Sequence, residues 1–148
     1  PYAVGNAEYP DNPRRFALLS RAALEYMVRR GRPVDVVHAH DWQAGLTPLY
    51  LRTMYRQNPH VGGARAVMTI HNLSYQGTFD PWWVTQLDLP WELYNIEQLE
   101  YWGRMSFLKA GVVNADVITT VSPQYAKEIQ TPEGSVGFDG ILRARAHR

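Results

Sequence analysis

The sequence predicts an α/β protein built on a parallel sheet with helices on both faces. Three short runs rich in β-branched residues are predicted strands, and helical patterns separate them along the chain; the runs are 34–38, 66–70 and 116–121. Each run is almost continuously apolar, as is typical of strands buried in a parallel sheet. Three strands make a thin sheet, so we expect the chain to be part of a larger domain.

The first element is a helix over 13–30. Asn12 is placed to cap it, and Pro13 suits the first helical position, where an N–H is not needed. Apolar residues at helical spacing form a stripe that we expect to face the core. The stripe consists of Phe16, Leu19, Ala23, Tyr26 and Met27.

The middle of the chain continues the alternation of strands and helices. Thr47 and Pro48 predict the start of a helix that follows the first strand and runs to about Gln57. Pro81 and Pro90 are each placed to begin a short helix after the second strand. These signals place helical segments on both sides of the second strand, as a chain of βαβ units requires.

The last third repeats the pattern. A helix is predicted over 106–114, and the third strand follows it at 116–121. Ser122 and Pro123 then form the cap and first turn of another helix. The chain therefore ends in the same alternation with which it begins.

Composition excludes several classes of protein. The 148 residues carry 15 basic and 14 acidic side chains, a net charge of +1, which argues against a nucleic-acid partner. The chain has no cysteine, so disulfides, thiolate metal sites and cysteine nucleophiles are excluded. No apolar run reaches the length of a membrane helix, so we expect no membrane association. Because the sequence begins at Pro1 rather than methionine, we expect it to be an excerpt.

Polar side chains follow all three predicted strands. His38, His40 and Asp41 lie at the end of the first, His71 at the end of the second, and Ser122 after the third. Ligands of open parallel sheets bind beyond the carboxyl ends of the strands. This edge of the sheet is therefore the candidate site, although Ser122 also has a simpler role as a helix cap.

Several chemistries remain open at this edge. His38, His40 and Asp41 resemble the ligand sets of metal-dependent hydrolases, yet His38 also suits a strand histidine bonded to the backbone, and Asp41 a helix cap. A neutral His71 ring is placed to donate to a sugar hydroxyl or to developing charge, the alternative being a structural histidine. The sequence contains no Gly-x-Ser-x-Gly elbow and no phosphate-binding glycine loop.

Aromatic residues are concentrated in one stretch of 21 positions. Aromatic faces stack on sugar rings, and the Tyr hydroxyl and Trp N–H add polar contacts. Packing between short helices is the alternative for each of these residues. They are Trp82, Trp83, Trp91, Tyr94, Tyr101 and Trp102.

A series of motifs resembles bacterial glycogen synthase and plant starch synthase. Two of them surround the candidate site; they are VVHAHDWQAGL at 36–46 and TIHNLSYQG at 69–77. Others lie on either side, namely YPDN and RFALL between positions 9 and 19, SFLKAG at 106–111, TVSPQYAKEI at 120–129 and GFDGIL at 137–142. The likeness covers nearly the whole chain in the same order.

The resemblance implies a retaining enzyme that transfers glucose from ADP-glucose to the non-reducing end of an α-1,4-glucan. It implies a GT-B fold of two Rossmann-like domains, of which residues 1–148 would be part of the N-terminal, acceptor-side domain. It also implies no cofactor and no catalytic metal. His71 and Asp41 fall on catalytic positions of the family. The matching substrate-binding positions are His40, Trp42, Asn72, Tyr75 and Tyr2.

The chain also departs from the family pattern. It lacks the Lys-x-Gly-Gly-Leu loop that binds donor phosphate and the C-terminal nucleotide-sugar domain, so we expect the chain alone to be inactive. The resemblance implies a cytoplasmic protein in a bacterium, or a plastid protein in a plant. The alternatives are a non-catalytic glucan-binding fragment or paralogue and, third, a metal hydrolase. The sequence leaves the donor nucleotide, ADP or UDP, and the oligomeric state undecided.

Overall fold

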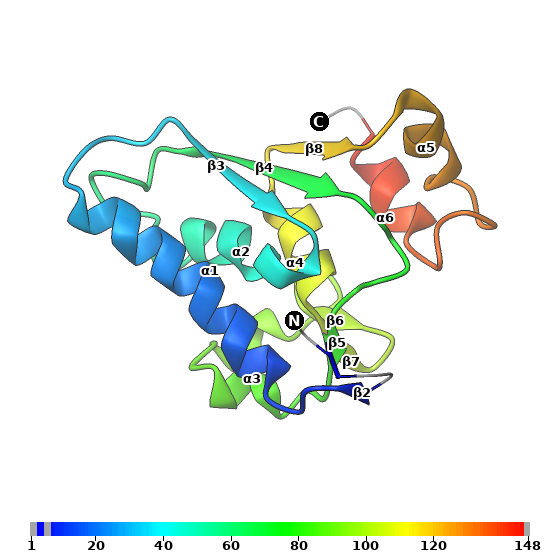
Figure 1. The fold of residues 1–148 in the computed structure, drawn as a ribbon, viewed down its shortest axis with the longest axis horizontal. Coiled ribbons are helices and arrows are strands. Elements are labelled where there is room, and N and C mark those ends of the chain that lie inside the picture. The colour runs from blue at the N-terminus through cyan, green and yellow to red at the C-terminus, as the bar shows by residue number, and fades with distance from the viewer. Residues whose placement is uncertain (1–2, 5–6, 147–148) are drawn as a thin grey trace.

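A parallel three-stranded sheet forms the upper layer of the molecule (Figure 1). The computed structural model describes residues 3–4 and 7–146. The strand order is β3-β4-β8, and β4 pairs in parallel with both neighbours. The predicted α/β class and parallel sheet are therefore confirmed. The three strands are β3 (Val36–His40), β4 (Arg65–Ile70) and β8 (Val117–Thr120).

The described helices cover only one face of this sheet. Figure 1 shows α1, α2 and α4 on the same side of the strands, and α5 packs against β8. On β3, Val37 and Ala39 are buried toward these helices, whereas Val36, His38 and His40 are exposed. The expected second helical layer is absent from the described part of the chain.

Helix α1 (Asn12–Arg29) begins one residue before its predicted start. The N-cap is Asp11, which makes no side-chain capping bond, so the predicted cap at Asn12 is wrong. Asn12 is instead fully buried, and its Oδ1 accepts from Arg15 Nη1 at 3.1 Å. The amide side chain therefore fixes the first turn from inside the helix.

The buried face of α1 also differs from the predicted stripe. Phe16 and Met27 pack against the core as predicted, but Leu19 and Tyr26 are 52% and 63% exposed. The buried residues are mostly small or polar: Asn12, Pro13, Ala17, Ser20 and Leu24. Because α1 packs against α2 and the short helix η1, small side chains on this face let the helices approach closely. Hydrophobic periodicity does not detect such a face.

The segment after β3 is compact and buried. A 3₁₀ turn, η1 (Trp42–Ala44), leads into α2 (Leu46–Arg52), whose N-cap is Gly45 rather than the predicted Thr47. The helix ends five residues before Gln57, so its predicted length is wrong. Gly45 is required here because an added Cβ would lie 2.1 Å from the Phe107 carbonyl oxygen.

Serine caps open two helices in the last third, and the predicted cap at Ser122 is confirmed. Ser106 Oγ accepts from the Lys109 N–H at 3.1 Å and opens α4 (Phe107–Asn114). Ser122 Oγ accepts from the Tyr125 N–H at 3.0 Å and opens α5 (Pro123–Glu128). A further helix that the sequence pattern does not predict, α6 (Asp139–Ala144), follows.

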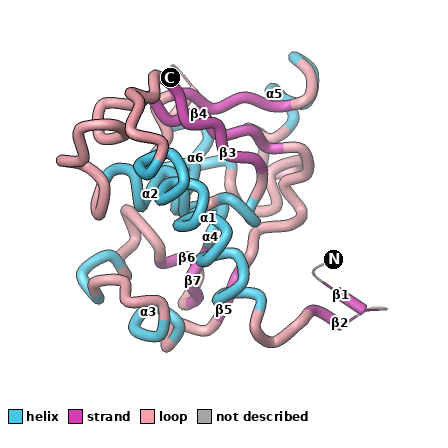
Figure 2. The backbone as a smooth tube through the Cα atoms, turned by 60° about the vertical axis from the view of Figure 1, so that its left-hand side comes forward, coloured by secondary structure: helices cyan, strands magenta, loops and turns pink. Residues whose placement is uncertain are grey.

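A small antiparallel sheet lies on the far side of the helices from the parallel sheet (Figure 2). Its order is β5-β7-β6, and it carries a helical turn from Trp83 and another that Pro90 caps. A separate hairpin precedes α1. None of these strands is predicted from the sequence, because each has only two or three residues. The elements are β1 (Ala3–Val4), β2 (Ala7–Glu8), β5 (Thr78–Phe79), α3 (Trp83–Gln86), η2 (Trp91–Leu93), β6 (Glu100–Tyr101) and β7 (Arg104–Ser106).

Within residues 3–4 and 7–146, no helix combines the length and the apolar character needed to cross a membrane.

Candidate functional site

Asp41 and His71 form a hydrogen-bonded pair at the carboxyl edge of the parallel sheet. They follow β3 and β4 directly, as the sequence predicts. The Asp41 carboxylate accepts twice from the same residue: Oδ1 from the His71 backbone N–H at 2.8 Å and Oδ2 from the ring Nδ1 at 2.9 Å. The side chains are 30% and 49% exposed respectively. The pair therefore faces solvent while its geometry is fixed from two directions.

This contact decides which imidazole nitrogen carries the proton. An ionised carboxylate only accepts, so Nδ1 of His71 donates to Asp41. A neutral ring then presents Nε2 as an acceptor, and only the protonated ring donates through Nε2. The expectation of a neutral His71 that donates to a sugar hydroxyl is therefore corrected: a neutral ring accepts from that hydroxyl.

Asp41 has a strained backbone. Its φ of 55° and ψ of −177° place it beside a region that glycine almost alone occupies. Its N–H donates to the Thr69 carbonyl at 2.9 Å, which holds the residue against β4. Asp41 is the N-cap of η1, yet its side chain makes no capping bond and turns to His71 instead. The strained backbone thus directs the carboxylate at the imidazole.

A row of histidines extends from this pair across the open face of the sheet. The His40 ring stacks on His71 with centroids 5.5 Å apart, and the His38 ring lies 4.2 Å from His40. His38 Nε2 is 2.6 Å from Thr69 Oγ1, so its partner is a side chain rather than the backbone. Desolvation, with smaller contributions from His40 and His71, lowers the pKa of His38. The neutral form of His38 is therefore favoured.

The metal-site alternative finds no support in this arrangement. The carboxylate of Asp41 is committed to His71, and Nε2 of His38 is committed to Thr69. Among residues 3–4 and 7–146, no group of three or more histidine, aspartate or glutamate side chains is arranged to hold a metal ion.

Trp42 is buried, although the sequence places it at a sugar site. It is 2% exposed, and its ring packs edge-on against Phe16 with centroids 4.8 Å apart. Gly77 lies so close that an added Cβ would come within 2.4 Å of the indole. One edge of Trp42 nevertheless reaches a cavity of about 230 Å³ that Tyr75 also lines. Trp42 therefore forms the floor of this cavity, with little surface for stacking.

Asn72 and Tyr75 lie in the exposed turn that follows His71. Asn72 Oδ1 accepts from the Ser74 N–H at 3.0 Å, an Asx turn that shapes the loop. Tyr75 is 51% exposed at the mouth of the cavity. Tyr2, the last of the predicted site residues, lies outside the described residues.

The cavity also has walls that sequence reasoning missed. Gln76 and Val136 line it, and Gln76 Nε2 donates to the Val136 carbonyl at 3.1 Å. Tyr125 supports the same loop, because its hydroxyl accepts from the Leu73 N–H at 3.0 Å. The paired glycines at 77 and 137, both with positive φ, are the signal that marks these tight turns.

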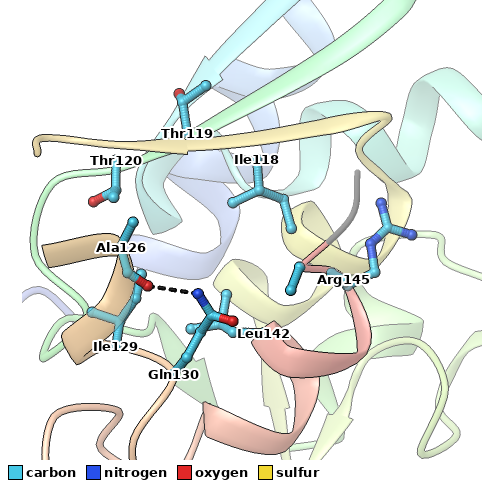
Figure 3. A pocket seen from close by; sticks show the side chains of 9 residues that line it. Ile118, Thr119, Thr120, Ala126, Ile129, Gln130, Leu142 and Arg145 are labelled. Atoms are coloured by element: carbon cyan, nitrogen blue, oxygen red, sulfur yellow. Dashed lines mark hydrogen bonds between the residues drawn. The ribbon is translucent and has the colours of Figure 1, made fainter. Parts of the chain in front are cut away.

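A second cavity lies under β8 and contains none of the predicted site residues. It has a volume of about 150 Å³ and is enclosed by β8, α5 and α6 (Figure 3). Its walls are largely aliphatic, and Gln130 Nε2 donates to the Ala126 carbonyl at 2.7 Å. The candidate site is therefore the Asp41–His71 pair together with the cavity beside Tyr75.

Comparisons with known proteins agree on one family. The sequence matches the family model of the starch synthase catalytic domain over residues 1–144. Glycogen synthase from Anaeromyxobacter dehalogenans (strain 2CP-C) is 48% identical over 145 residues, which are 98% of this chain and 30% of that protein. Glycogen synthase 2 from Bradyrhizobium diazoefficiens is 53% identical over 142 residues, covering 94% and 28%.

A solved structure gives the same result. The catalytic domain of starch synthase IV from Arabidopsis thaliana, bound to ADP and acarbose, superposes with a TM-score of 0.86 at 30% sequence identity. The match covers 95% of this chain and 29% of that one. This chain therefore spans less than a third of the length of the relatives that it matches.

Proposed function

Because this chain belongs to the starch synthase catalytic domain family, with a GT-B glycosyltransferase fold, we propose that it is part of a retaining glucosyltransferase. The complete enzyme transfers glucose from ADP-glucose to the non-reducing end of an α-1,4-glucan, glycogen or starch. The observation that carries this proposal is the Asp41–His71 pair at the sheet edge; Trp42 and Tyr75, which follow the two residues in the chain, line a cavity of about 230 Å³.

His71 contacts the donor glucose in this proposal. Its neutral ring accepts a hydrogen bond from a glucose hydroxyl through Nε2, because Nδ1 is committed to Asp41. The acceptor nitrogen, oriented by the Asp41 carboxylate, stabilises the positive charge that develops on the reacting sugar. Asp41 is a positioning residue that acts through His71.

The remaining site residues bind sugar or shape its pocket. Tyr75 offers an exposed ring and hydroxyl beside the cavity, and Trp42 supplies its apolar floor. Asn72 and His40 border His71 from the loop and from β3. We assign Tyr2 to the same substrate site on the family resemblance alone.

Donor binding requires groups from outside this chain. The starch synthase IV relative was solved with ADP, which supports an adenine nucleotide as the donor's leaving group. We propose that the remainder of a longer polypeptide completes the cleft and neutralises the diphosphate, and that no cofactor takes part. The 148-residue chain alone is therefore expected to show no glucan elongation from ADP-glucose.

The experiment is His71→Ala in the complete polypeptide, with radiolabelled ADP-glucose and glycogen. We expect turnover to fall by roughly two orders of magnitude or more, since a charge-stabilising contact is lost. His60→Ala is the matched control, because His60 lies in the loop before β4, away from the site. Near-normal turnover in the His71 variant contradicts the assignment. Glucan binding without transfer by the unsubstituted protein points instead to a non-catalytic glucan-binding paralogue.

A further inference from the structure

The β6–β7 hairpin presents a tryptophan at a position that normally takes asparagine. Tyr101 pairs with Arg104, so the loop has two residues, Trp102 and Gly103, with φ values of 51° and 74°. Positive φ at both positions is the requirement of a type I′ turn, for which Asn-Gly is the preferred sequence. Trp102 is strained there and yet 82% exposed, so packing does not explain its presence.

A cavity of about 360 Å³ opens beside this turn. Trp102 and Tyr101 contribute aromatic walls, and Ile96 and Ile141 contribute aliphatic ones. The other lining residues are Glu100, Lys109, Gly137 and Gly140. The Tyr101 hydroxyl donates to the Val136 carbonyl at 3.3 Å, which holds that ring in place. Val136 is a second strained residue, with a φ of 50°. One strained residue, Trp102, therefore lines the cavity, and a second, Val136, holds the Tyr101 ring that forms another wall.

The base of the cavity contains a buried cation. Lys109 is 4% exposed, and its ammonium donates to the Ile96 and Glu100 carbonyls. An ammonium has three N–H donors, so one is left after these two contacts with the described residues. Desolvation lowers the pKa of Lys109, with partial opposition from Glu100. The cavity therefore combines aromatic faces with a fixed hydrogen-bond donor.

We propose that this cavity is a secondary binding site for an α-1,4-glucan chain, with a glucose ring stacked on Trp102 and a sugar hydroxyl accepting from Lys109. Aromatic faces beside fixed polar groups match the apolar faces and equatorial hydroxyls of glucose. This inference rests on the proposed function, which supplies the polymer. Val136 lines the cavity at Tyr75 and adjoins Gly137 in this one, so the two cavities are neighbours along a single surface.

Trp102→Asn tests the proposal without risking the fold. Asparagine suits the type I′ turn, so we expect the variant to be as stable as the parent protein or more so. In the complete polypeptide, we expect about a tenfold rise in the dissociation constant for glycogen, from affinity electrophoresis without donor, and a similar rise in the KM for glycogen. Trp102→Phe, which keeps a ring, is expected to lose much less affinity.

Trp91→Asn is the matched control, because Trp91 is 52% exposed in the same tract and does not line the cavity. It is expected to bind glycogen like the parent. Unchanged glycogen affinity in Trp102→Asn overturns the proposal, as does an equal loss in the Phe variant. A change of oligomeric state without loss of glycogen affinity also overturns it and assigns the cavity to a protein contact. Failure of the proposed function is separate, since it appears as absence of transfer in the unsubstituted protein.

Discussion

The Asp41 carboxylate determines which nitrogen of the His71 imidazole carries the proton, and the strained backbone of Asp41 holds that carboxylate in place. Its two oxygens hold His71 by the main-chain N–H and by Nδ1, at 2.8 and 2.9 Å. One residue thus fixes the position, rotation and tautomer of the ring. Trp42, its neighbour in sequence, contributes in a different way, because it is buried and lines the cavity with one edge of its ring.

Asp41→Asn isolates the tautomer from the geometry. The amide Oδ1 still accepts from the His71 N–H, but the amide nitrogen donates to Nδ1 and moves the ring proton to Nε2. Nε2 then no longer accepts from the donor sugar, and we expect turnover of the complete enzyme to fall about ten- to a hundredfold. Steady-state transfer and the ¹⁵N shifts of the imidazole measure the two effects.

Asp35→Asn is the control for this substitution, because Asp35 is exposed and immediately precedes the opposite end of β3. It is expected to leave the turnover and the ¹⁵N shifts of the imidazole unchanged. Full turnover in the Asp41 variant, with the ring proton shown to be on Nε2, contradicts the role assigned to the pair.

At the scale of elements, the helical layer depends on close approach of backbones. The turn before α2 and the start of α4 meet at Gly45, where an added Cβ would lie 2.1 Å from the Phe107 carbonyl oxygen. The other side of the contact is Gly111, whose added Cβ would lie 3.0 Å from the Gly45 oxygen. At Gly45 the obstructing atoms belong to the backbone, whereas an added Cβ at Gly111 would also meet the Met68 side chain at 3.0 Å. This crossing sets the position of η1 and hence of Asp41.

Gly45→Ala is therefore expected to lower the free energy of unfolding by about 2–3 kcal/mol, since backbone atoms must move apart. Gly140→Ala is the contrasting substitution. Gly140 lies in α6 with nothing within 4 Å of an added Cβ, so alanine is expected to raise stability by about 0.5–1 kcal/mol through helix propensity. Urea unfolding followed by tryptophan fluorescence measures both. Equal effects at the two positions contradict the packing argument.

For the molecule as a whole, Asp116 ties together segments that are far apart in sequence. Its carboxylate pairs with Arg52 from α2 and, at 3.2 Å, with Arg65 from β4, and it accepts from the Ala66 N–H at 2.7 Å. Burial alone raises the pKa of Asp116, but the Ala66 N–H and the two arginines outweigh it and lower the pKa. The ionised carboxylate therefore stabilises the fold.

The contribution of Asp116 to the free energy of unfolding therefore depends on pH. Because the pKa is lowered in the folded state, the contribution of Asp116 is complete above about pH 4 and is lost as the pH falls through the lowered pKa. Asp116→Asn is expected to reduce the free energy of unfolding by about 1–3 kcal/mol at pH 7 and to flatten its decline below pH 4. Urea unfolding at pH 7, 4 and 3 tests this. Glu97→Gln, on an exposed loop, is the control. If the free energy of unfolding of the Asp116 variant declines below pH 4 as steeply as that of the parent protein, the assignment is contradicted.

Sequence reasoning was most accurate where the signal is local. The serine cap at 122 needs only a side chain three residues from its partner, and the strands need only β-branched runs. It was wrong for the face of α1, where Leu19 and Tyr26 are exposed, because the buried face depends on how closely a partner helix approaches. The two-residue strands carry too few residues for any period to be visible.

The sequence by itself determined the α/β class, the meeting of Asp41 and His71 at one sheet edge, and the family, since strand ends and ordered motifs are properties of the chain. Only the tertiary structure decided that one sheet face is open, that Trp42 is buried, that His71 carries its proton on Nδ1, and that Trp102 stands exposed at a strained turn. The first three depend on contacts between segments distant in sequence, and the last on the register of the β6–β7 hairpin. Such contacts are set by register and packing, which no local pattern encodes.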